Sequence, residues 1–108
     1  MYAGYILTQG AYVNYVYRFM HEGKEKSTTP LIRAAMNGYA DAVRVLISRG
    51  AEVNKAKPCN GYTVLHVAAR EGHVPVIELL LSKGASIDAR NKDGQTPRLH
   101  YLDSRKQP

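Results

Sequence analysis

The stretch that decides the fold is TVLHVAAREGHVPVIELLLSKGASID, residues 63–88. It holds two short apolar patterns with helical spacing, and a glycine follows each of them. Thr63 can cap the first helix with its hydroxyl, and Gly72 ends it because the position after a helix often takes a positive φ. The second helix is expected to start near Pro75, which a first helical turn tolerates, and to end at Gly84. This second helix is apolar on nearly every side, so the pair needs neighbouring copies to cover it.

A second stretch, TPLIRAAMNGYADAVRVLISRGAEVN at residues 29–54, repeats these features in the same order. The matched residues are Thr29 with Thr63, Leu31 with Leu65, Ala34 with Ala68, Ala35 with Ala69, Gly38 with Gly72, Val43 with Ile77, Leu46 with Leu80, Ile47 with Leu81, Gly50 with Gly84, Ala51 with Ala85, and Val53 with Ile87. A third copy begins at Thr96, so the threonines are 34 and then 33 residues apart. The small residues Ala68 and Ala69 are expected to let neighbouring helices approach closely.

This period, with T-P-L at residues 29–31 and L-H-x-A-A at residues 65–69, resembles the ankyrin repeat. The resemblance covers residues 1–97 and is strongest from residue 29 onward. It implies an all-α repeat solenoid in which stacked antiparallel helix pairs are joined by β-hairpin fingers. The expected divisions are a partial N-terminal repeat with its second helix (1–14), an extended first finger (15–28), two full repeats (29–62 and 63–95), and a partial C-terminal repeat with a tail (96–108).

The first finger departs most from the repeat pattern. The chain advances 15 residues from Asn14 to Thr29, but only 9 and 8 residues over the two corresponding later connections. The alternating residues that can share one strand face are Val13, Tyr15, Tyr17 and Phe19. The polar sequence HEGKEKS then reads as a turn and a returning strand. Two interpretations stay open: the aromatic side chains cap the N-terminal end of the stack, which we favour, or the finger recognises a partner.

Length, charge and cysteine content narrow the class of protein. The 108 residues carry a formal charge of +6, which favours acidic partners at long range. A single cysteine excludes an internal disulfide, and neither an N-x-S/T sequence nor a signal-peptide pattern occurs. A cytoplasmic location is therefore expected, with the nucleus as the alternative. No apolar run is long enough to cross a bilayer. Two full repeats are close to the minimum for such a stack, so we expect marginal stability.

No residue pattern in the chain indicates catalysis, a metal site or a cofactor. His66 and His73 stand at helix starts, where the resemblance implies structural histidines that bind neighbouring backbone. A structural zinc site needs four close ligands, and only Cys59 is near His66. Nothing in the sequence marks an oxyanion site for Cys59, and no P-loop or dinucleotide fingerprint occurs. We therefore expect a protein that is not an enzyme and binds no cofactor.

The resemblance implies protein–protein recognition through the finger tips and the concave face of the stack. The contact positions that it implies are Thr28, Arg33, Met36, Asn37, Asn60, Tyr62, Val67, Arg70, Glu71, Lys92, Asp93 and Gln95. Aromatic and basic character adds Tyr15, Tyr17, Lys57 and Arg90. The expected state is a monomer that binds an acidic protein partner and no membrane.

Two other functions stay open at the level of sequence. The first is a basic module that binds nucleic acid or another acidic surface. It is less favoured, because nucleic-acid binding calls for a continuous basic stripe with interleaved aromatic residues. The second is a spacer or docking segment of a longer multidomain protein.

Overall fold

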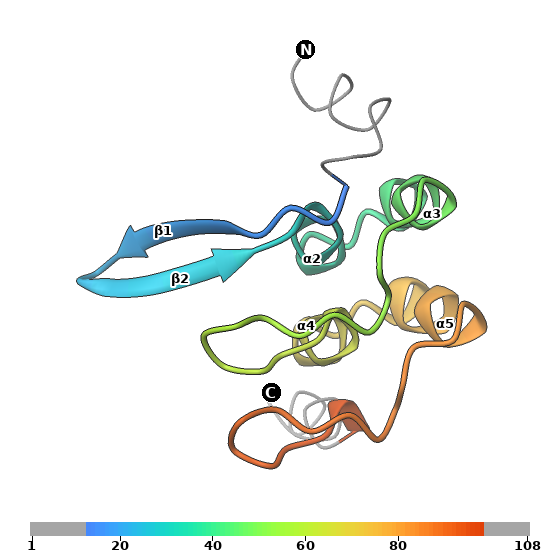
Figure 1. The fold of residues 1–108 in the computed structure, drawn as a ribbon. Helices are drawn as coiled ribbons and strands as arrows, with labels where there is room; N and C mark the ends of the chain where they lie inside the picture. Colours follow the sequence, from blue (N-terminus) through green and yellow to red (C-terminus); the bar gives the residue numbers. More distant parts are fainter. Residues whose placement is uncertain (1–12, 99–108) are drawn as a thin grey trace.

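The computed structural model describes residues 13–98. Its elements in chain order are β1 (Tyr17–His21), β2 (Lys24–Thr28), α2 (Pro30–Met36), α3 (Ala40–Ser48), α4 (Val64–Glu71) and α5 (Val74–Ser82). The helices form two pairs that stack, with α2 against α4 and α3 against α5 (Figure 1). The predicted fold class, a solenoid of helix pairs with a hairpin finger, is confirmed. The partial repeat predicted at 1–14 falls mainly on residues 1–12, which lie outside the described residues, as does the tail from residue 99.

The first helix of each pair begins at a threonine, as the sequence predicts. The Thr29 hydroxyl accepts a hydrogen bond from the Ile32 N–H (3.2 Å) at the start of α2. In α4 the cap is reciprocal: the His66 N–H donates to the Thr63 hydroxyl (3.4 Å), and the Thr63 N–H donates to His66 Nδ1 (3.1 Å). These side chains satisfy N–H groups that the helix itself leaves without a partner.

A tight turn joins the two helices of each pair in the same way. After α4, Gly72 adopts a φ of +74°, and the His73 N–H donates to the Ala68 carbonyl (3.1 Å). After α2, the Tyr39 N–H donates to the Ala34 carbonyl (3.0 Å). Neither α3 nor α5 has a side-chain cap. Their starts are therefore set by the turn that precedes them.

The core lies between the stacked helices. Ala35 of α2 and Ala68 of α4 are fully buried, and Ala69 is almost so. Because alanine has only a methyl group, α2 and α4 can lie close together, which is the packing role expected for Ala68 and Ala69. Larger buried side chains complete the core: Leu31, Ile32, Val43, Leu46, Leu65, Val76 and Leu80.

Side chains that reach across the stack tie one layer to the next. His73 Nε2 donates to the Met36 carbonyl (2.9 Å), and His66 Nε2 donates to the Gln95 carbonyl (2.8 Å). Asn14 donates to the Gly50 carbonyl (3.0 Å) and accepts from the Glu52 N–H (2.7 Å). One repeat later, Asn54 makes the same pair of bonds with Gly84 and Ser86 (3.1 and 2.8 Å). Each asparagine side chain thus binds the backbone that follows the next helix pair. The recurrence of asparagine in the sequence did not reveal this role.

The three connections differ in structure. β1 and β2 pair antiparallel, with Glu22 and Gly23 at the turn, both at positive φ (53° and 74°). The hairpin extends outward from the stack instead of folding back over its N-terminal end, so the favoured interpretation of a cap is not what the described residues show (Figure 1). The later two connections, within residues 55–62 and 89–95, contain turns but no assigned strands. The expectation of paired strands therefore holds for the first finger alone among residues 13–98.

Candidate functional site

The hairpin has two faces of different chemistry. The register pairs Tyr17 with Thr28, Phe19 with Lys26, and His21 with Lys24. Directly paired residues point to the same side of a sheet, so these six form one face, here called the aromatic face. The opposite face carries Arg18, Met20, Glu25 and Ser27, and Arg18 pairs with Glu25 at 3.3 Å. The one acidic residue within the two strands is thus on the opposite face and is already paired.

A groove of about 310 Å³ lies between the aromatic face and helix α2. We call it the hairpin groove; its lining residues are Phe19, His21, Lys26, Ser27, Thr28, Arg33, Met36, Asn37 and Lys57. Five predicted contact residues meet here from three different elements: Thr28, Arg33, Met36, Asn37 and Lys57. Four other lining residues were missing from the predicted set: Phe19, His21, Lys26 and Ser27. If the sequence had been interpreted with a two-residue turn at Glu22–Gly23, it would have predicted that Lys26 pairs with Phe19.

The hairpin groove is cationic. Lys26, Arg33 and Lys57 line it, whereas no aspartate or glutamate among residues 13–98 does. The pKa of Lys57 is lowered, first by partial burial and then by the nearby positive charges of Arg70 and Lys26, although Cys59 acts in the opposite direction. Burial without a paired acid disfavours the charged ammonium group. An acidic group that enters the groove would therefore find unpaired positive charge.

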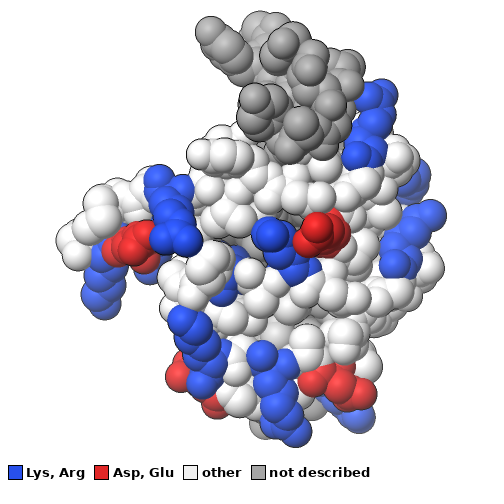
Figure 2. Space-filling model, viewed as in Figure 1, with Lys and Arg blue, Asp and Glu red and all other residues white. Residues whose placement is uncertain are grey.

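Basic side chains are not joined into one stripe on the face of the molecule seen in Figure 2. Lysine and arginine residues there are separated by neutral surface, and several stand beside acidic ones. Pairs of opposite charge within the described chain include Arg44 with Asp41 (2.7 Å) and Arg70 with Glu71 (3.3 Å). This arrangement does not supply the row of cations that follows a nucleic-acid backbone.

The second finger holds its residues tightly. The Asn60 side chain accepts from the Tyr62 N–H (3.0 Å), and Lys57 and Tyr62 close the turn through a backbone hydrogen bond of 2.7 Å. The Tyr62 ring is half-buried and lies 5.4 Å from the Arg70 guanidinium carbon, within cation–π range. Tyr62, Arg70 and Glu71 therefore form one small cluster where the second finger meets α4.

The third finger is anchored by its basic residues. Lys92 Nζ donates to the Pro58 carbonyl of the second finger (2.7 Å), and Arg90 donates to the Gly94 carbonyl (3.0 Å). The buried Asn91 side chain accepts from the N–H groups of Asp93 and Gln95, both at 2.9 Å. Lys92 and Arg90 thus support the shape of the fingers in addition to carrying charge.

Two predicted contact residues are buried in the structure. Val67 has 0% exposure and belongs to the core, because α2 packs against its helix. The prediction that Val67 contacts a partner is therefore wrong for this packing. Thr28 is 6% exposed, and its hydroxyl donates to the Thr29 carbonyl (3.3 Å), so it contributes only to the wall of the groove.

Cys59 lies in the second finger with its thiol exposed. Its Sγ is 3.2 Å from Ser27 Oγ, which joins the base of the hairpin to the second finger. Partial burial raises the pKa of the Cys59 thiol, but the Ser27 hydrogen bond and the Lys57 charge outweigh it, so that the pKa is lowered overall. In the repeat alignment, Ser27 corresponds to Gly61 and Gly94, the positive-φ glycines at the turns of the other two fingers. In the hairpin, the positive-φ glycine of the turn is Gly23, nearer the tip.

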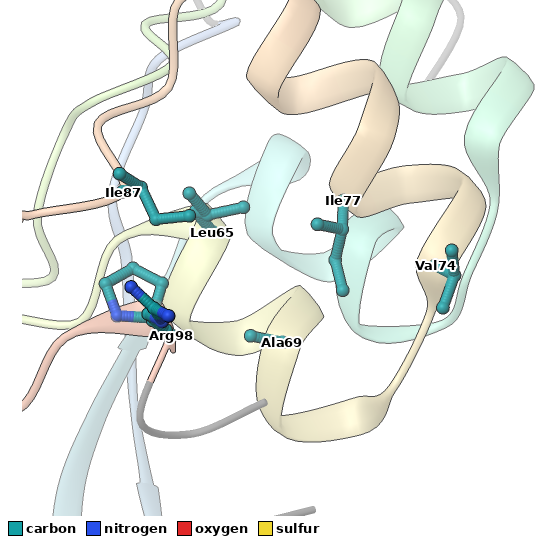
Figure 3. Close-up of a pocket in the computed structure, with 7 residues that line it drawn as sticks. Leu65, Ala69, Val74, Ile77, Ile87 and Arg98 are labelled. Atoms are coloured by element: carbon teal, nitrogen blue, oxygen red, sulfur yellow. The ribbon is translucent and has the colours of Figure 1, made fainter. Parts of the chain in front are cut away.

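An apolar pocket of about 240 Å³ lies at the other end of the stack (Figure 3). It is lined by Leu65, Ala69, Val74, Ile77, Ile87, Pro97 and Arg98. Val74 and Ile87 are each more than 40% exposed, so α5 is not covered on all sides by the described residues. The pocket lies on the side of α4 and α5 that faces away from α2 and α3, where a following helix pair would stack.

Within residues 13–98, no group of three or more histidine, cysteine, aspartate or glutamate side chains is placed to hold a metal ion. No helix among those residues is long and apolar enough to cross a membrane.

Stacked helix pairs with capped first helices and outward fingers define a helical repeat solenoid. The family model "Ankyrin repeats (3 copies)" matches residues 5–91, and the chain belongs to the ankyrin repeat family. Members of this family generally serve as protein–protein interaction modules and are typically not enzymes.

Several curated proteins are similar to this chain over 70 residues, or 64% of its length. The human Ankyrin repeat and KH domain-containing protein 1 is 50% identical, the mouse Ankyrin repeat domain-containing protein 17 is 51% identical, and the Drosophila Ankyrin repeat and KH domain-containing protein mask is 47% identical. The matched region spans only 3%, 3% and 2% of these proteins, respectively. The likeness therefore covers only a small part of each of these proteins.

Proposed function

We propose that this chain is a non-catalytic module that binds a partner protein through its finger tips and concave face, with the hairpin groove at the centre. The observation that carries the proposal is the lining of that groove. Phe19, Arg33 and Asn37 are exposed there, and none of them belongs to the core of the stack. Side chains that the core does not require are available to match a partner.

The proposed contact surface consists of the contact residues predicted from the sequence, except Val67. To these we add Phe19, His21 and Lys26. The partner is acidic where it meets the groove, since the groove holds three cations and no acid. The module acts as a monomer in the cytoplasm or the nucleus. A reducing compartment suits its exposed Cys59 thiol.

Site-specific photo-crosslinking tests this function. A photo-reactive amino acid is placed at position 37 in the groove and, as the matched control, at the exposed position 44 on α3. After irradiation in cells that express the protein, we expect one partner protein to be captured from position 37 and not from position 44. The partner is then purified and its binding to the chain is measured directly.

Two outcomes would contradict the proposal. Equal capture from both positions would mean that the concave side has no special role. Crosslinks from position 37 that disappear on nuclease treatment would point to nucleic acid instead.

A further inference from the structure

We propose that the hairpin groove binds an extended acidic segment of the partner, in which an aspartate or glutamate lies two residues from a large apolar residue. This inference rests on the proposed function, because it names the part of a protein partner that the groove recognises. It concerns the long first finger, the element in which this chain departs from its own repeat pattern.

The groove offers an apolar contact. Phe19 is 44% exposed, although it lies on a paired strand that holds its backbone in place. Met36 faces it from the end of α2, where it packs partly against the core. Methionine adapts its shape to different partners, and a rigid aromatic ring provides contact area at a low entropic cost. A leucine or phenylalanine side chain suits contact with Phe19 and Met36 and the groove volume of about 310 Å³.

The groove also offers positive charge. Arg33 comes from α2, Lys26 from β2 and Lys57 from the second finger, so three elements direct cations into one space. Among residues 13–98, no acidic side chain forms an ion pair with any of the three. Burial is the main cause that lowers the pKa of Lys57; Cys59 raises it, whereas the neighbouring charges of Arg70 and Lys26 lower it. A carboxylate from the partner would supply the missing charge through charge-assisted hydrogen bonds.

Because apolar and cationic side chains line the same groove, the proposal names a spacing for the partner's two residues. In an extended chain, side chains at i and i+2 point to the same side, roughly 6.6–6.8 Å apart. One apolar residue and one acidic residue at that spacing can therefore face the groove at the same time. A helix would need a spacing of three or four residues instead. The groove thus favours the pattern apolar-x-acidic, in either direction, over an acidic run or an apolar run alone.

The opposite face of the hairpin supplies a matched control. Met20 follows Phe19 in the same strand, points to the opposite side and is 67% exposed. Phe19→Ser and Met20→Ser therefore remove neighbouring exposed apolar side chains from opposite faces. For charge, Lys26→Glu with Arg33→Glu can be compared with Arg49→Glu and Lys83→Glu. The latter two residues are exposed at the ends of α3 and α5.

The test selects binders from a library of random 12-residue peptides against the full chain. We expect enrichment of peptides with leucine, isoleucine or phenylalanine two residues from aspartate or glutamate. A consensus peptide should lose affinity by about tenfold or more with Phe19→Ser and with Lys26→Glu/Arg33→Glu. Met20→Ser and Arg49→Glu/Lys83→Glu should leave its affinity unchanged. Circular dichroism checks that each variant folds.

Other results would overturn the inference. They are enrichment of peptides without an acid, no enrichment at all, or a consensus peptide that ignores both groove variants. If the crosslinked partner still binds in these cases, the proposed function stands and only the identity of the segment is wrong. If oligouridylate displaces the peptide and binds the chain more tightly than the peptide does, the groove is a nucleic-acid site instead.

Discussion

The first and second connections occupy equivalent places in the stack but hold their residues differently. In the second, contacts hold three consecutive residues: Asn60 shapes the turn, Tyr62 packs beside α4, and Gly61 lies against the third finger. In the first, the added length forms a hairpin with its own register, and Phe19 and Met20 remain exposed. A connection of minimal length is therefore shaped by its neighbours. The longer one is shaped by its own strand pairing, which leaves side chains available for binding.

Both connections extend from a rigid stack of helices. Ala68→Leu tests the packing of that stack directly, because Ala68 is fully buried in α4, which packs against α2. Overpacking should lower the free energy of unfolding by about 1–3 kcal/mol. Urea denaturation measures the loss, and Ala56→Leu at an exposed position of the second finger is the control. Equal midpoints for Ala68→Leu and the unaltered chain would refute this description of the core.

Glycine substitutions test whether neighbours shape the second connection. Gly61 and Gly94 have nearly the same φ (76° and 77°), but a Cβ at Gly61 would lie 2.9 Å from the Lys92 backbone nitrogen, whereas Gly94 has open space. Both alanine variants should lose roughly 1–2 kcal/mol through the positive φ. Gly61→Ala should lose about 0.5–1.5 kcal/mol more, because the Lys92 N–H bond to the Asn60 carbonyl (3.0 Å) is disturbed. Thermal unfolding of the two variants should rank them in this order, and the reverse order would contradict the close approach.

Acid should weaken the link between α4 and the third finger more than it affects the hairpin. Burial lowers the pKa of His66, even though its hydrogen bonds to the Gln95 and Ala89 backbone raise it. The unfolded chain therefore binds a proton more readily than the folded chain. The stability that neutral His66 contributes is complete above its ordinary pKa of about 6.5. It declines as the pH falls below that value and is lost once the pH has passed the lower pKa of the folded state.

Urea midpoints between pH 7.5 and 5.5 measure this effect. The decline should not exceed about 1.4 kcal/mol per pH unit from one histidine. His66→Gln should be less stable at pH 7.5 but should depend less on pH. His21→Gln in the exposed hairpin should behave like the unaltered chain. If His66→Gln kept the full pH dependence, another group would be responsible.

The smallest expected change in stability is in the hairpin. Phe19→Ser should alter the free energy of unfolding by less than about 0.5 kcal/mol, since the ring is exposed and outside the core. Replacing Tyr15, Tyr17 and Phe19 together by serine extends the test, with an added loss from the Tyr15–Tyr17 ring pair at 4.7 Å. Calorimetry decides between the two interpretations of these residues. A loss of several kcal/mol in the free energy of unfolding would support the interpretation that these residues cap the stack. Weakened binding with near-normal stability would support the interpretation that they recognise a partner.

The sequence by itself determined the helix pairs and the number of residues between them. Threonine caps, positive-φ glycines and paired alanines act over a few residues, so a repeated pattern at Thr29 and Thr63 predicts repeated local structure. The same spacing revealed the long first finger. Local signals were sufficient because a repeat contacts only its immediate neighbours.

Tertiary structure alone decided which repeated positions are available for binding. Arg33 and Val67 occupy the same place in their repeats, yet Arg33 is exposed in the groove and Val67 is buried in the core. The groove also brings Lys57 against Lys26, more than 30 residues earlier, and Ser27 against Cys59. These contacts between residues distant in the sequence depend on the strand register and on how adjacent layers pack. Both are set by contacts between distant residues, which local sequence patterns do not encode.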